Sequence, residues 1–140
     1  MRYTLLLLAA VSSPCIAVDM QPGLWEVNVD NRSVVFPDLP LEPVKVQRCV
    51  SAEDARDPTK VLGDAVNQDA SNCVYTEKTF SGNMFHFKAR CTGTVALDVG
   101  GEITYTATSF SGALMSDVDM GDQKMQFQNN VTGRRLGGCS

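Results

Sequence analysis

The motifs that usually mark an active site are missing from this sequence. It contains one histidine, His86, and it has no G-x-S-x-G, no H-E-x-x-H and no glycine-rich phosphate loop. Catalysis needs acid, base or nucleophilic groups that converge on one place. Asp117 and Asp119 could form such a pair, but the hairpin predicted below places both on an exposed strand face. We therefore expect a protein that is not an enzyme and has no cofactor, with an enzyme of unknown reaction as an alternative.

No hydrophobic run is long enough to cross a membrane. The longest run, Leu5–Val11, is far shorter than the roughly 18 residues that a membrane span needs. A positive charge precedes it, and a Ser-Ser-Pro break and Cys15-Ile16-Ala17 follow it, which places small residues before a cleavage point. This layout predicts a signal peptide over residues 1–17. The proline before Cys15 disfavours a lipid anchor at that cysteine.

Basic residues are too few for a nucleic-acid-binding protein. Lys and Arg number 12 against 16 Asp and Glu, and the formal net charge is −4. Binding to nucleic acid depends on neutralising phosphates, so we do not expect this partner. The chain that follows the signal peptide, 18–140, has the length of a single domain, and we expect it in the periplasm or secreted.

The C-x-x-C motif is absent as well, which argues against thioredoxin-like chemistry and against zinc. Once Cys15 is removed with the signal peptide, the remaining cysteines are Cys49, Cys73, Cys91 and Cys139. An even number of cysteines in an oxidising compartment predicts structural disulfides, here two, with three possible connectivities.

Most of the exported chain alternates between apolar and polar residues, which is the pattern of β-strands. The first two predicted strands are Leu24–Val29 and Lys45–Val50. Residues 31–43 between them are expected to form an extended crossover, because they are rich in proline, which cannot pair inside a sheet. One short helical stretch follows, with helix-start signals at Ser51 with Asp54 and at Asp57-Pro58.

A hairpin in the middle of the chain explains one cysteine pair. A three-residue loop at Ser81–Asn83, with Asn83 at positive φ, places Cys73 directly opposite Cys91. Opposed strand residues lie at bridging distance, so this register predicts the Cys73–Cys91 disulfide and leaves Cys49 to pair with Cys139. The register also separates a buried face, with Tyr75, Phe85, Phe87 and Ala89, from an exposed face, with Thr76, Lys78, His86, Lys88 and Arg90.

The glycine pair Gly100-Gly101 predicts a second hairpin. A two-residue turn there would place threonines opposite the apolar residues of the preceding strand. A three-residue loop that also includes Val99 instead pairs Leu97 with Ile103 and keeps the apolar side chains on one face. We therefore expect the three-residue loop.

A third hairpin follows from Gly121-Asp122, which suits a two-residue turn with glycine first. This turn places Val118 opposite Met125 on the inner face, and Asp119 opposite Lys124 outside. Taken together, the patterns predict a mostly β protein. We expect a curved antiparallel meander sheet or a partly closed barrel, with one short helix and two disulfides.

Several short motifs match those of a known family. They are Pro22–Glu26 just after the signal peptide, a cysteine before the helical stretch, the central cysteine pair, and the basic-Leu-Gly-x-Cys ending of Gly133–Cys139. In these motifs the chain resembles the domain-of-unknown-function family thirty-six-seventeen, a family of small exported bacterial proteins. The resemblance covers nearly all of the exported chain. It implies a periplasmic or secreted location, and it supplies no catalytic residues.

Two segments have the residue composition of binding surfaces. The stripe of Lys78, His86, Lys88 and Arg90 predicts an anion-binding patch on an otherwise acidic protein. The proline-spaced segment with Val34, Val35, Phe36, Leu39 and Leu41 predicts a hydrophobic docking loop, or else a cover for the open edge or end of the sheet.

Copper handling is an alternative, because Met84 and His86 share a strand face and thioether and imidazole groups suit copper. The cations beside His86 oppose a metal, so we expect His86 to be a surface residue and not a ligand. The sequence thus predicts a non-enzymatic binding module of the periplasm or the secreted space. Its partner would be an envelope protein, a glycan or a lipid.

Overall fold

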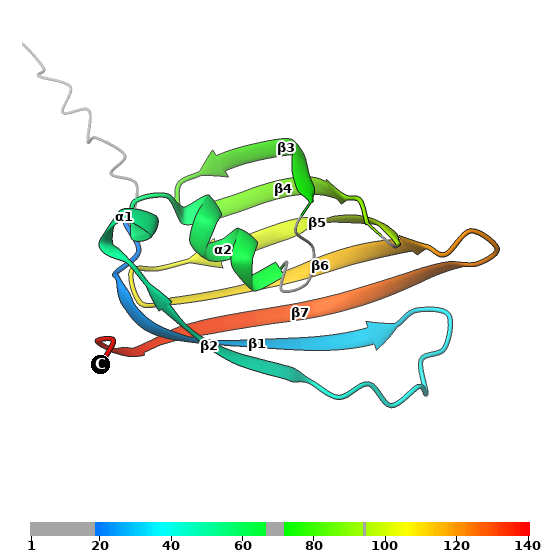
Figure 1. Ribbon diagram of the computed structural model, residues 1–140, viewed down its shortest axis with the longest axis horizontal. Coiled ribbons are helices and arrows are strands. Elements are labelled where there is room, and N and C mark those ends of the chain that lie inside the picture. Colours follow the sequence, from blue (N-terminus) through cyan, green and yellow to red (C-terminus); the bar gives the residue numbers. More distant parts are fainter. Residues whose placement is uncertain (1–18, 67–71, 94) are drawn as a thin grey trace, which may run out of the picture.

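A computed structural model describes residues 19–66, 72–93 and 95–140. In these residues seven antiparallel strands form an open sheet in the order β2-β1-β7-β6-β5-β4-β3, so that β2 and β3 are its edges (Figure 1). The elements are β1 (Gly23–Ser33), β2 (Val44–Val50), α1 (Ala52–Ala55), α2 (Pro58–Val66), β3 (Cys73–Ser81), β4 (Met84–Cys91), β5 (Ala96–Tyr105), β6 (Ser109–Asp119) and β7 (Lys124–Gly137). The mostly β prediction is confirmed. The predicted signal peptide, 1–17, lies outside the described residues.

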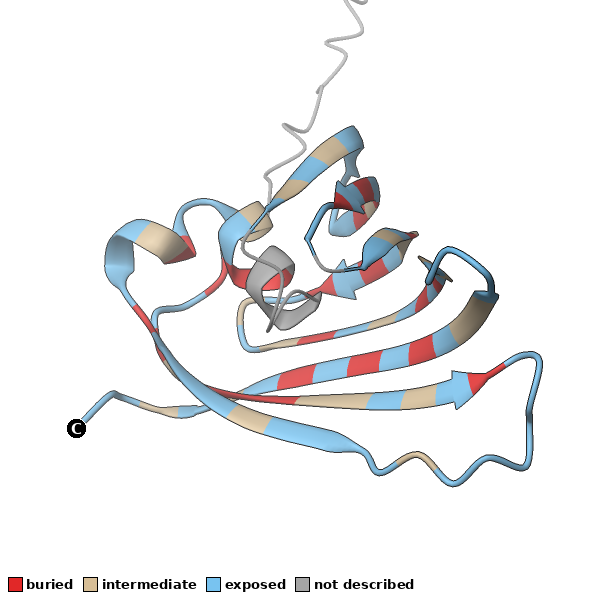
Figure 2. Cartoon of the chain, turned by 45° about the vertical axis from the view of Figure 1, so that its right-hand side comes forward, coloured by how far each residue is buried: buried red, intermediate tan, exposed pale blue. Residues whose placement is uncertain are grey.

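The sheet is curved, and the helices lie on its concave side (Figure 2). Buried and exposed residues alternate along strands such as β4, β6 and β7, so that one set of side chains faces this side and the other set faces outward. Because the sheet does not close, its concave face needs a cover, and the helices provide one over part of it.

The segment between β1 and β2 differs from the prediction. β1 continues through Ser33, where it pairs with Phe127 of β7, and it also pairs with β2 along Gly23–Val29. Residues 34–43 therefore connect two neighbouring strands and are not a crossover. The first predicted strand ends too early. Asn31 and Arg32 precede the first proline, Pro37, so their backbone N–H groups can donate hydrogen bonds to the neighbouring strand.

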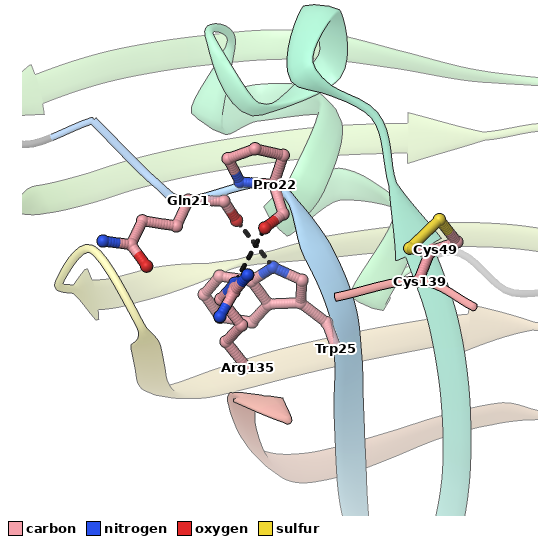
Figure 3. The surroundings of a disulfide bond; sticks show 6 residues. All are labelled: Gln21, Pro22, Trp25, Cys49, Arg135 and Cys139. Carbon is pink, nitrogen blue, oxygen red and sulfur yellow. Dashed lines mark hydrogen bonds between the residues drawn. A yellow bond between two sulfur atoms is a disulfide. The ribbon is translucent and has the colours of Figure 1, made fainter. Parts of the chain in front are cut away.

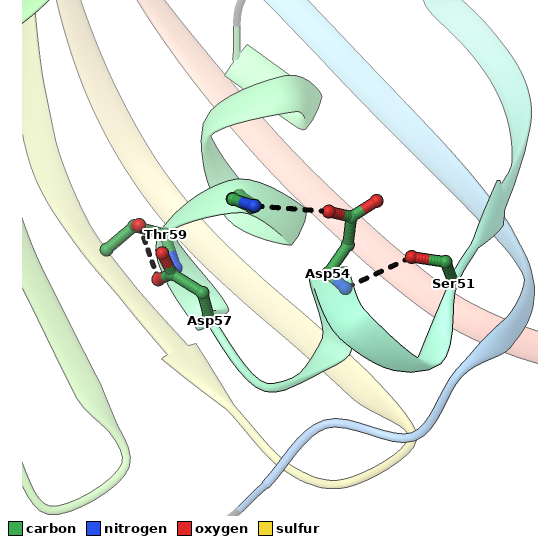
Figure 4. A network of polar contacts seen from close by, with 5 residues as sticks. Ser51, Asp54, Asp57 and Thr59 are labelled. Carbon is green, nitrogen blue, oxygen red and sulfur yellow. Dashed lines mark hydrogen bonds and ion pairs between the residues drawn. The ribbon is translucent and has the colours of Figure 1, made fainter.

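The predicted helical stretch consists of two short helices. Ser51 caps α1, since its Oγ accepts a hydrogen bond of 3.1 Å from the backbone N–H of Asp54 (Figure 4). Asp57 then accepts a bond of 3.0 Å from the N–H of Thr59. The single helix of the prediction is wrong because Pro58 disfavours a helical conformation at Asp57 and so separates α1 from α2.

One part of the concave face is tightly packed, and we call it the covered region. Trp25 stacks on Phe110 with ring centroids 5.9 Å apart, and Phe85 stacks on Phe87 at 5.1 Å. The core of this region comprises Met20, Trp25, Val27, Val50, Ala55, Val61, Leu62, Phe85, Phe87, Tyr105 and Phe110. A Cβ atom on Gly133 would meet the ring of Phe110, so the glycine makes room for the aromatic side chain.

The N-terminal segment and a disulfide close this end of the sheet (Figure 3). The indole N–H of Trp25 donates to the carbonyl of Gln21 at 2.9 Å, and Arg135 Nε donates to the carbonyl of Pro22 at 2.7 Å. The Cys49–Cys139 disulfide links β2 to the segment after β7. Gln21 and Pro22 are thus bonded to side chains of β1 and β7.

The hairpin of β3 and β4 combines a correct pairing with a wrong turn. Cys73 lies opposite Cys91 and is disulfide-bonded to it, as the sequence predicts. The turn, however, has two residues, with Ser81 opposite Met84, and the positive φ of +61° falls on Gly82 and not on Asn83. A β-bulge between Tyr75 and Glu77 restores the register at the cysteines.

The glycine pair Gly100-Gly101 does not form a turn. Both glycines lie inside β5, and Leu97 pairs with Cys91 and Val118 instead of Ile103. A Cβ atom on Gly101 would meet Leu114 and the carbonyl of Ala113, and one on Gly100 would lie 3.0 Å from the carbonyl of Phe87. The pair therefore marks a close approach between strands, which is the other common reason for glycine in a strand.

The last predicted hairpin is confirmed in its register. Val118 lies opposite Met125, and Asp119 opposite Lys124. Gly121 has a φ of +85°, as a glycine-first turn requires, and the N–H of Met120 donates to the carbonyl of Gln123 at 2.9 Å.

Candidate functional site

The concave face carries a groove beside the covered region. It has a volume of about 360 Å³, within the range of small-molecule sites. It lies toward the strand ends that carry the 34–43 loop and the turn between β6 and β7. Its lining comes from four strands and this loop: Val29, Asn31, Leu41, Glu42, Leu97, Val99, Leu114, Ser116, Phe127, Asn129 and Val131.

The floor of the groove is apolar because strand alternation directs the same set of side chains inward as in the covered region. Leu114 and Val131 are buried beneath the groove, whereas Leu97 and Phe127 are partly exposed. No aromatic cluster or helix side chain lines this part of the face among the described residues. The apolar surface is therefore open to a ligand.

Two polar side chains interrupt this apolar floor. The amide Nδ2 of Asn129 donates to Oγ of Ser116 at 2.6 Å, and both residues are buried. Within residues 19–66, 72–93 and 95–140 neither side chain has another hydrogen-bond partner. The Asn129 carbonyl oxygen and the Ser116 hydroxyl hydrogen are thus available to a group in the groove.

The rim of the groove comes from the 34–43 loop. Leu41, which is partly exposed, and Glu42, which is exposed, both line the groove there. Glu42 makes no ion pair with any other described residue. A negatively charged group at this rim would meet a like charge, so the groove suits neutral or positively charged molecules.

The apolar residues of the predicted docking loop differ in their surroundings. Leu41 lines the groove, whereas Val34, Val35, Phe36 and Leu39 remain exposed. The loop therefore presents one of the five predicted residues to the groove and the other four to solvent.

The predicted basic patch does not form one surface. The bulge in β3 places Lys78 opposite Phe87, on the inner face, where its ammonium group lies 5.5 Å from the ring centroid of Tyr75. His86, Lys88 and Arg90 stay on the outer face. The four-residue stripe was wrong because the bulge moves every residue of β3 after Thr76 to the other face.

Carboxylates neutralise the rest of this patch. Lys88 Nζ lies 3.4 Å from Glu77, and Arg90 Nε lies 2.8 Å from Asp98. The hydrogen bond from Arg90 holds the pKa of Asp98 below its ordinary value. These pairs leave little net positive charge on the outer face.

His86 is half-exposed and lies between two carboxylates, which the sequence did not predict. Its Nδ1 is 3.4 Å from Glu102, and its Nε2 is 4.0 Å from Glu77. In the described part of the chain no group of three or more His, Cys, Asp or Glu side chains is arranged to hold a metal ion.

A charged cluster on the outer face surrounds Glu26, whose side chain is 10% exposed. Arg134 lies 3.3 Å from its carboxylate, Lys45 3.9 Å, and the Gln47 amide 3.5 Å. Burial by itself raises the pKa of Glu26, but the Gln47 hydrogen bond and the charges of Lys45 and Arg134 outweigh it and lower the pKa. This cluster ties β2, β1 and β7 together and lies on the face opposite the groove.

The groove residues of β6 and β7 carry a signal that the sequence interpretation missed. Ser116 and Asn129 occupy inward positions of strands whose other inward residues are apolar, such as Leu114 and Val131. A polar residue at such a position is unusual and needs a structural or functional reason.

Comparison with known families agrees with the motifs at both ends of the chain. The profile of a family described as "Protein of unknown function (DUF3617)" matches residues 20–139. The chain belongs to DUF3617. No curated protein and no solved structure matches it. In the described residues of this DUF3617 chain, no helix is long and apolar enough to span a membrane.

Proposed function

We propose that this DUF3617 protein is a non-enzymatic binding module of the periplasm or the secreted space, and that the groove holds a neutral amphipathic molecule. The observation that carries the proposal is an open apolar groove with one buried polar pair, Ser116–Asn129, in its floor. Ligand sites commonly combine an apolar lining with a few placed polar groups in this way.

The chemistry of the lining defines the ligand class. An acyl or similar chain would contact Val99, Leu114 and Phe127, and a hydroxyl, ester or amide would bond to the Ser116–Asn129 pair. The carboxylate of Glu42 at the rim disfavours a free fatty acid, because that head group is an anion at neutral pH. We infer a monoacyl compound with an uncharged head group.

Export is part of the proposal. Two disulfides are typical of proteins that fold in an oxidising compartment. Residues 1–17 carry the layout of a signal peptide, and the family match begins just after them. An intact mass of the protein recovered from the envelope that corresponds to a chain starting at Val18 would support this inference, and retention of residues 1–17 would contradict it.

The binding proposal is tested in solution with monolauroylglycerol and laurate as probes. We expect monolauroylglycerol to bind and laurate to bind more weakly, as measured by displacement of a fluorescent apolar probe and by native mass spectrometry. The variant Leu97→Trp should fill the groove and abolish binding, since Leu97 lines it. The matched control, Ala96→Trp, alters the adjacent exposed residue and should leave binding unchanged.

Equal effects of the two tryptophan variants, or no binding of either probe, would contradict the proposal. A preference for laurate would leave the groove as the site but overturn the neutral head group.

A further inference from the structure

Exposed apolar side chains gather at one end of the sheet, where the groove lies. Four of them come from the 34–43 loop, and the fifth, Met120, comes from the turn between β6 and β7. Both connections lie at the same end of the strands (Figure 1). We call this set the apolar tip: Val34 (49% exposed), Val35 (54%), Phe36 (57%), Leu39 (45%) and Met120 (57%).

Hydrogen bonds hold the apolar tip in place. The N–H of Val34 donates to the carbonyl of Gln126 on β7 at 2.9 Å, and the N–H of Phe36 donates to the buried Oγ of Ser33 at 3.1 Å. The N–H of Leu39 donates to the carbonyl of Phe36 at 3.0 Å and closes a turn with Pro37 at its second position. The loop thus presents its apolar side chains to solvent in a defined geometry.

Every charged side chain in the two connections that carry the apolar tip is acidic, and the hollow beside Val35 adds three carboxylates, of Asp98, Asp117 and Asp119, against the cations of Arg90 and Lys124. The 34–43 loop contains Asp38 and Glu42, the 120–123 turn contains Asp122, and neither contains Lys or Arg. These carboxylates repel an anionic surface and attract the ammonium groups of zwitterionic lipid head groups.

We propose that the apolar tip docks on a lipid bilayer with zwitterionic head groups. The apolar side chains would enter the boundary between head groups and acyl chains, and Asp38, Glu42 and Asp122 would lie at the level of the ammonium groups. Phosphatidylethanolamine and phosphatidylcholine have this combination of an outer cation and an apolar interior.

The composition of the tip favours a bilayer over a protein partner. Protein interfaces draw most of their affinity from Trp, Tyr and Arg anchors that fill pockets, whereas Leu and Val are under-represented among such anchors. The tip has none of these three residue types and spreads its apolar groups over two connections. A fluid lipid surface needs no complementary pockets and so accepts this arrangement.

Docking of this kind bears on the groove. Leu41 lines the groove and belongs to the same loop as Val35 and Phe36. A tip placed at the membrane would bring the rim of the groove to the head-group region, where a monoacyl lipid could pass between bilayer and protein. This consequence rests on the proposed function, but the docking itself does not.

The test is co-sedimentation of the protein with vesicles of phosphatidylethanolamine and phosphatidylcholine. The variant Val35→Ser/Phe36→Ser should lower the partition coefficient about tenfold or more, because two half-exposed apolar side chains are lost. The matched control is Met115→Ser/Leu136→Ser, which removes apolar side chains of similar exposure (40% and 42%) away from the tip. It should change binding less than about twofold. All forms begin at the same residue, so the N-terminal segment contributes equally.

A second arm replaces part of the phosphatidylcholine by phosphatidylglycerol. We expect binding to weaken, and Asp38→Lys should reverse this preference because it adds a cation to the tip. Equal losses in the two serine variants, no vesicle binding by the wild type, or a wild-type preference for phosphatidylglycerol would overturn the proposal. So would self-association that Val35→Ser/Phe36→Ser abolishes without a change in vesicle binding, since the partner would then be a second copy.

The two proposals fail separately. Groove binding is measured in solution without vesicles, and docking is measured without monolauroylglycerol. If Leu97→Trp abolishes vesicle binding while the tip variant does not, the groove and not the tip contacts the lipid.

Discussion

The covered region and the groove belong to the same strands and differ in what lies over them. β1 contributes Trp25 and Val27 to the first and Val29 and Asn31 to the second, all from one face of a single strand. Over the covered region, helices and aromatic rings complete a core. Over the groove, the same apolar face of the strands is exposed to solvent. Strand alternation thus creates an apolar face, and the connections determine whether that face serves stability or is left open to a ligand.

The largest effect should come from the disulfide that closes the covered end. Cys49 and Cys139 are 90 residues apart in the sequence, and Cys73 and Cys91 are 18 apart. In the chain-entropy model the first bridge contributes about 4.5 kcal/mol and the second about 3 kcal/mol. Urea denaturation of Cys49→Ser/Cys139→Ser and of Cys73→Ser/Cys91→Ser measures both. A larger loss in the second variant would show that the covered end is held by other contacts.

Leucine-to-alanine substitutions compare the two regions directly. Leu62 of α2 is fully buried in the covered region, so Leu62→Ala should lower the free energy of unfolding by about 3 kcal/mol. Leu97 lines the open groove and is partly exposed, so Leu97→Ala should lower it by about 1 kcal/mol. The same denaturation curves test this ratio. Similar losses at the two sites would mean that the groove is filled in solution.

Removal of the polar pair of the groove should weaken ligand binding without lowering the free energy of unfolding. Replacing both partners by apolar residues, in Ser116→Val/Asn129→Leu, removes two buried polar groups and should leave the free energy of unfolding unchanged or raise it by about 1 kcal/mol. Binding of monolauroylglycerol should fall at the same time. The control Ser111→Val/Asn130→Leu alters exposed residues of the same two strands and should keep binding intact. A lower free energy of unfolding in Ser116→Val/Asn129→Leu would show that the pair stabilises the fold.

The smallest effect concerns the outer face behind both regions. The pKa of Glu26 is lowered in the folded state, so its ionised form stabilises the fold above the ordinary glutamate pKa of 4.5. This contribution is lost as the pH falls from 4.5 through the lowered pKa. Glu26→Gln should therefore be less stable than the wild type at pH 7, and the difference should vanish in acid. Thermal unfolding across this pH range provides the measurement, and a constant difference would exclude an ionic origin.

The sequence predicted the parts of the fold that depend on local pattern. Gly121-Asp122 set the register of β6 and β7, because a two-residue turn leaves no freedom once glycine is fixed at its first position. Cys73 and Cys91 were correctly paired, but through two errors that cancelled. The turn at Gly82 is one residue shorter than predicted, and the bulge at Thr76 restores that residue. No local pattern marks this bulge.

The predicted turn at Gly100-Gly101 and the predicted outer position of Lys78 were wrong for the same reason. Both depend on how neighbouring strands pair, which the local sequence does not show. Glycine signals a tight turn and a close approach of strands equally well, and only the neighbouring strands distinguish them. The carboxylates around His86 come from β3 and β5, which pair with β4 on either side, so their positions depend on long-range registers. The groove also depends on long-range registers, because its polar pair joins Ser116 of β6 to Asn129 of β7.

An open sheet has a further consequence for how the molecule behaves among its own copies. In the part of the chain that the structure describes, β2 and β3 are the edge strands of the sheet, and sheet edges can invite other chains to add strands and begin aggregates. The bulge at Thr76 interrupts the regular spacing of donors along β3, and Lys45 and the preceding Pro43 flank the start of β2. The openness that leaves room for a ligand is thus accompanied at both edges by features that discourage fibril growth.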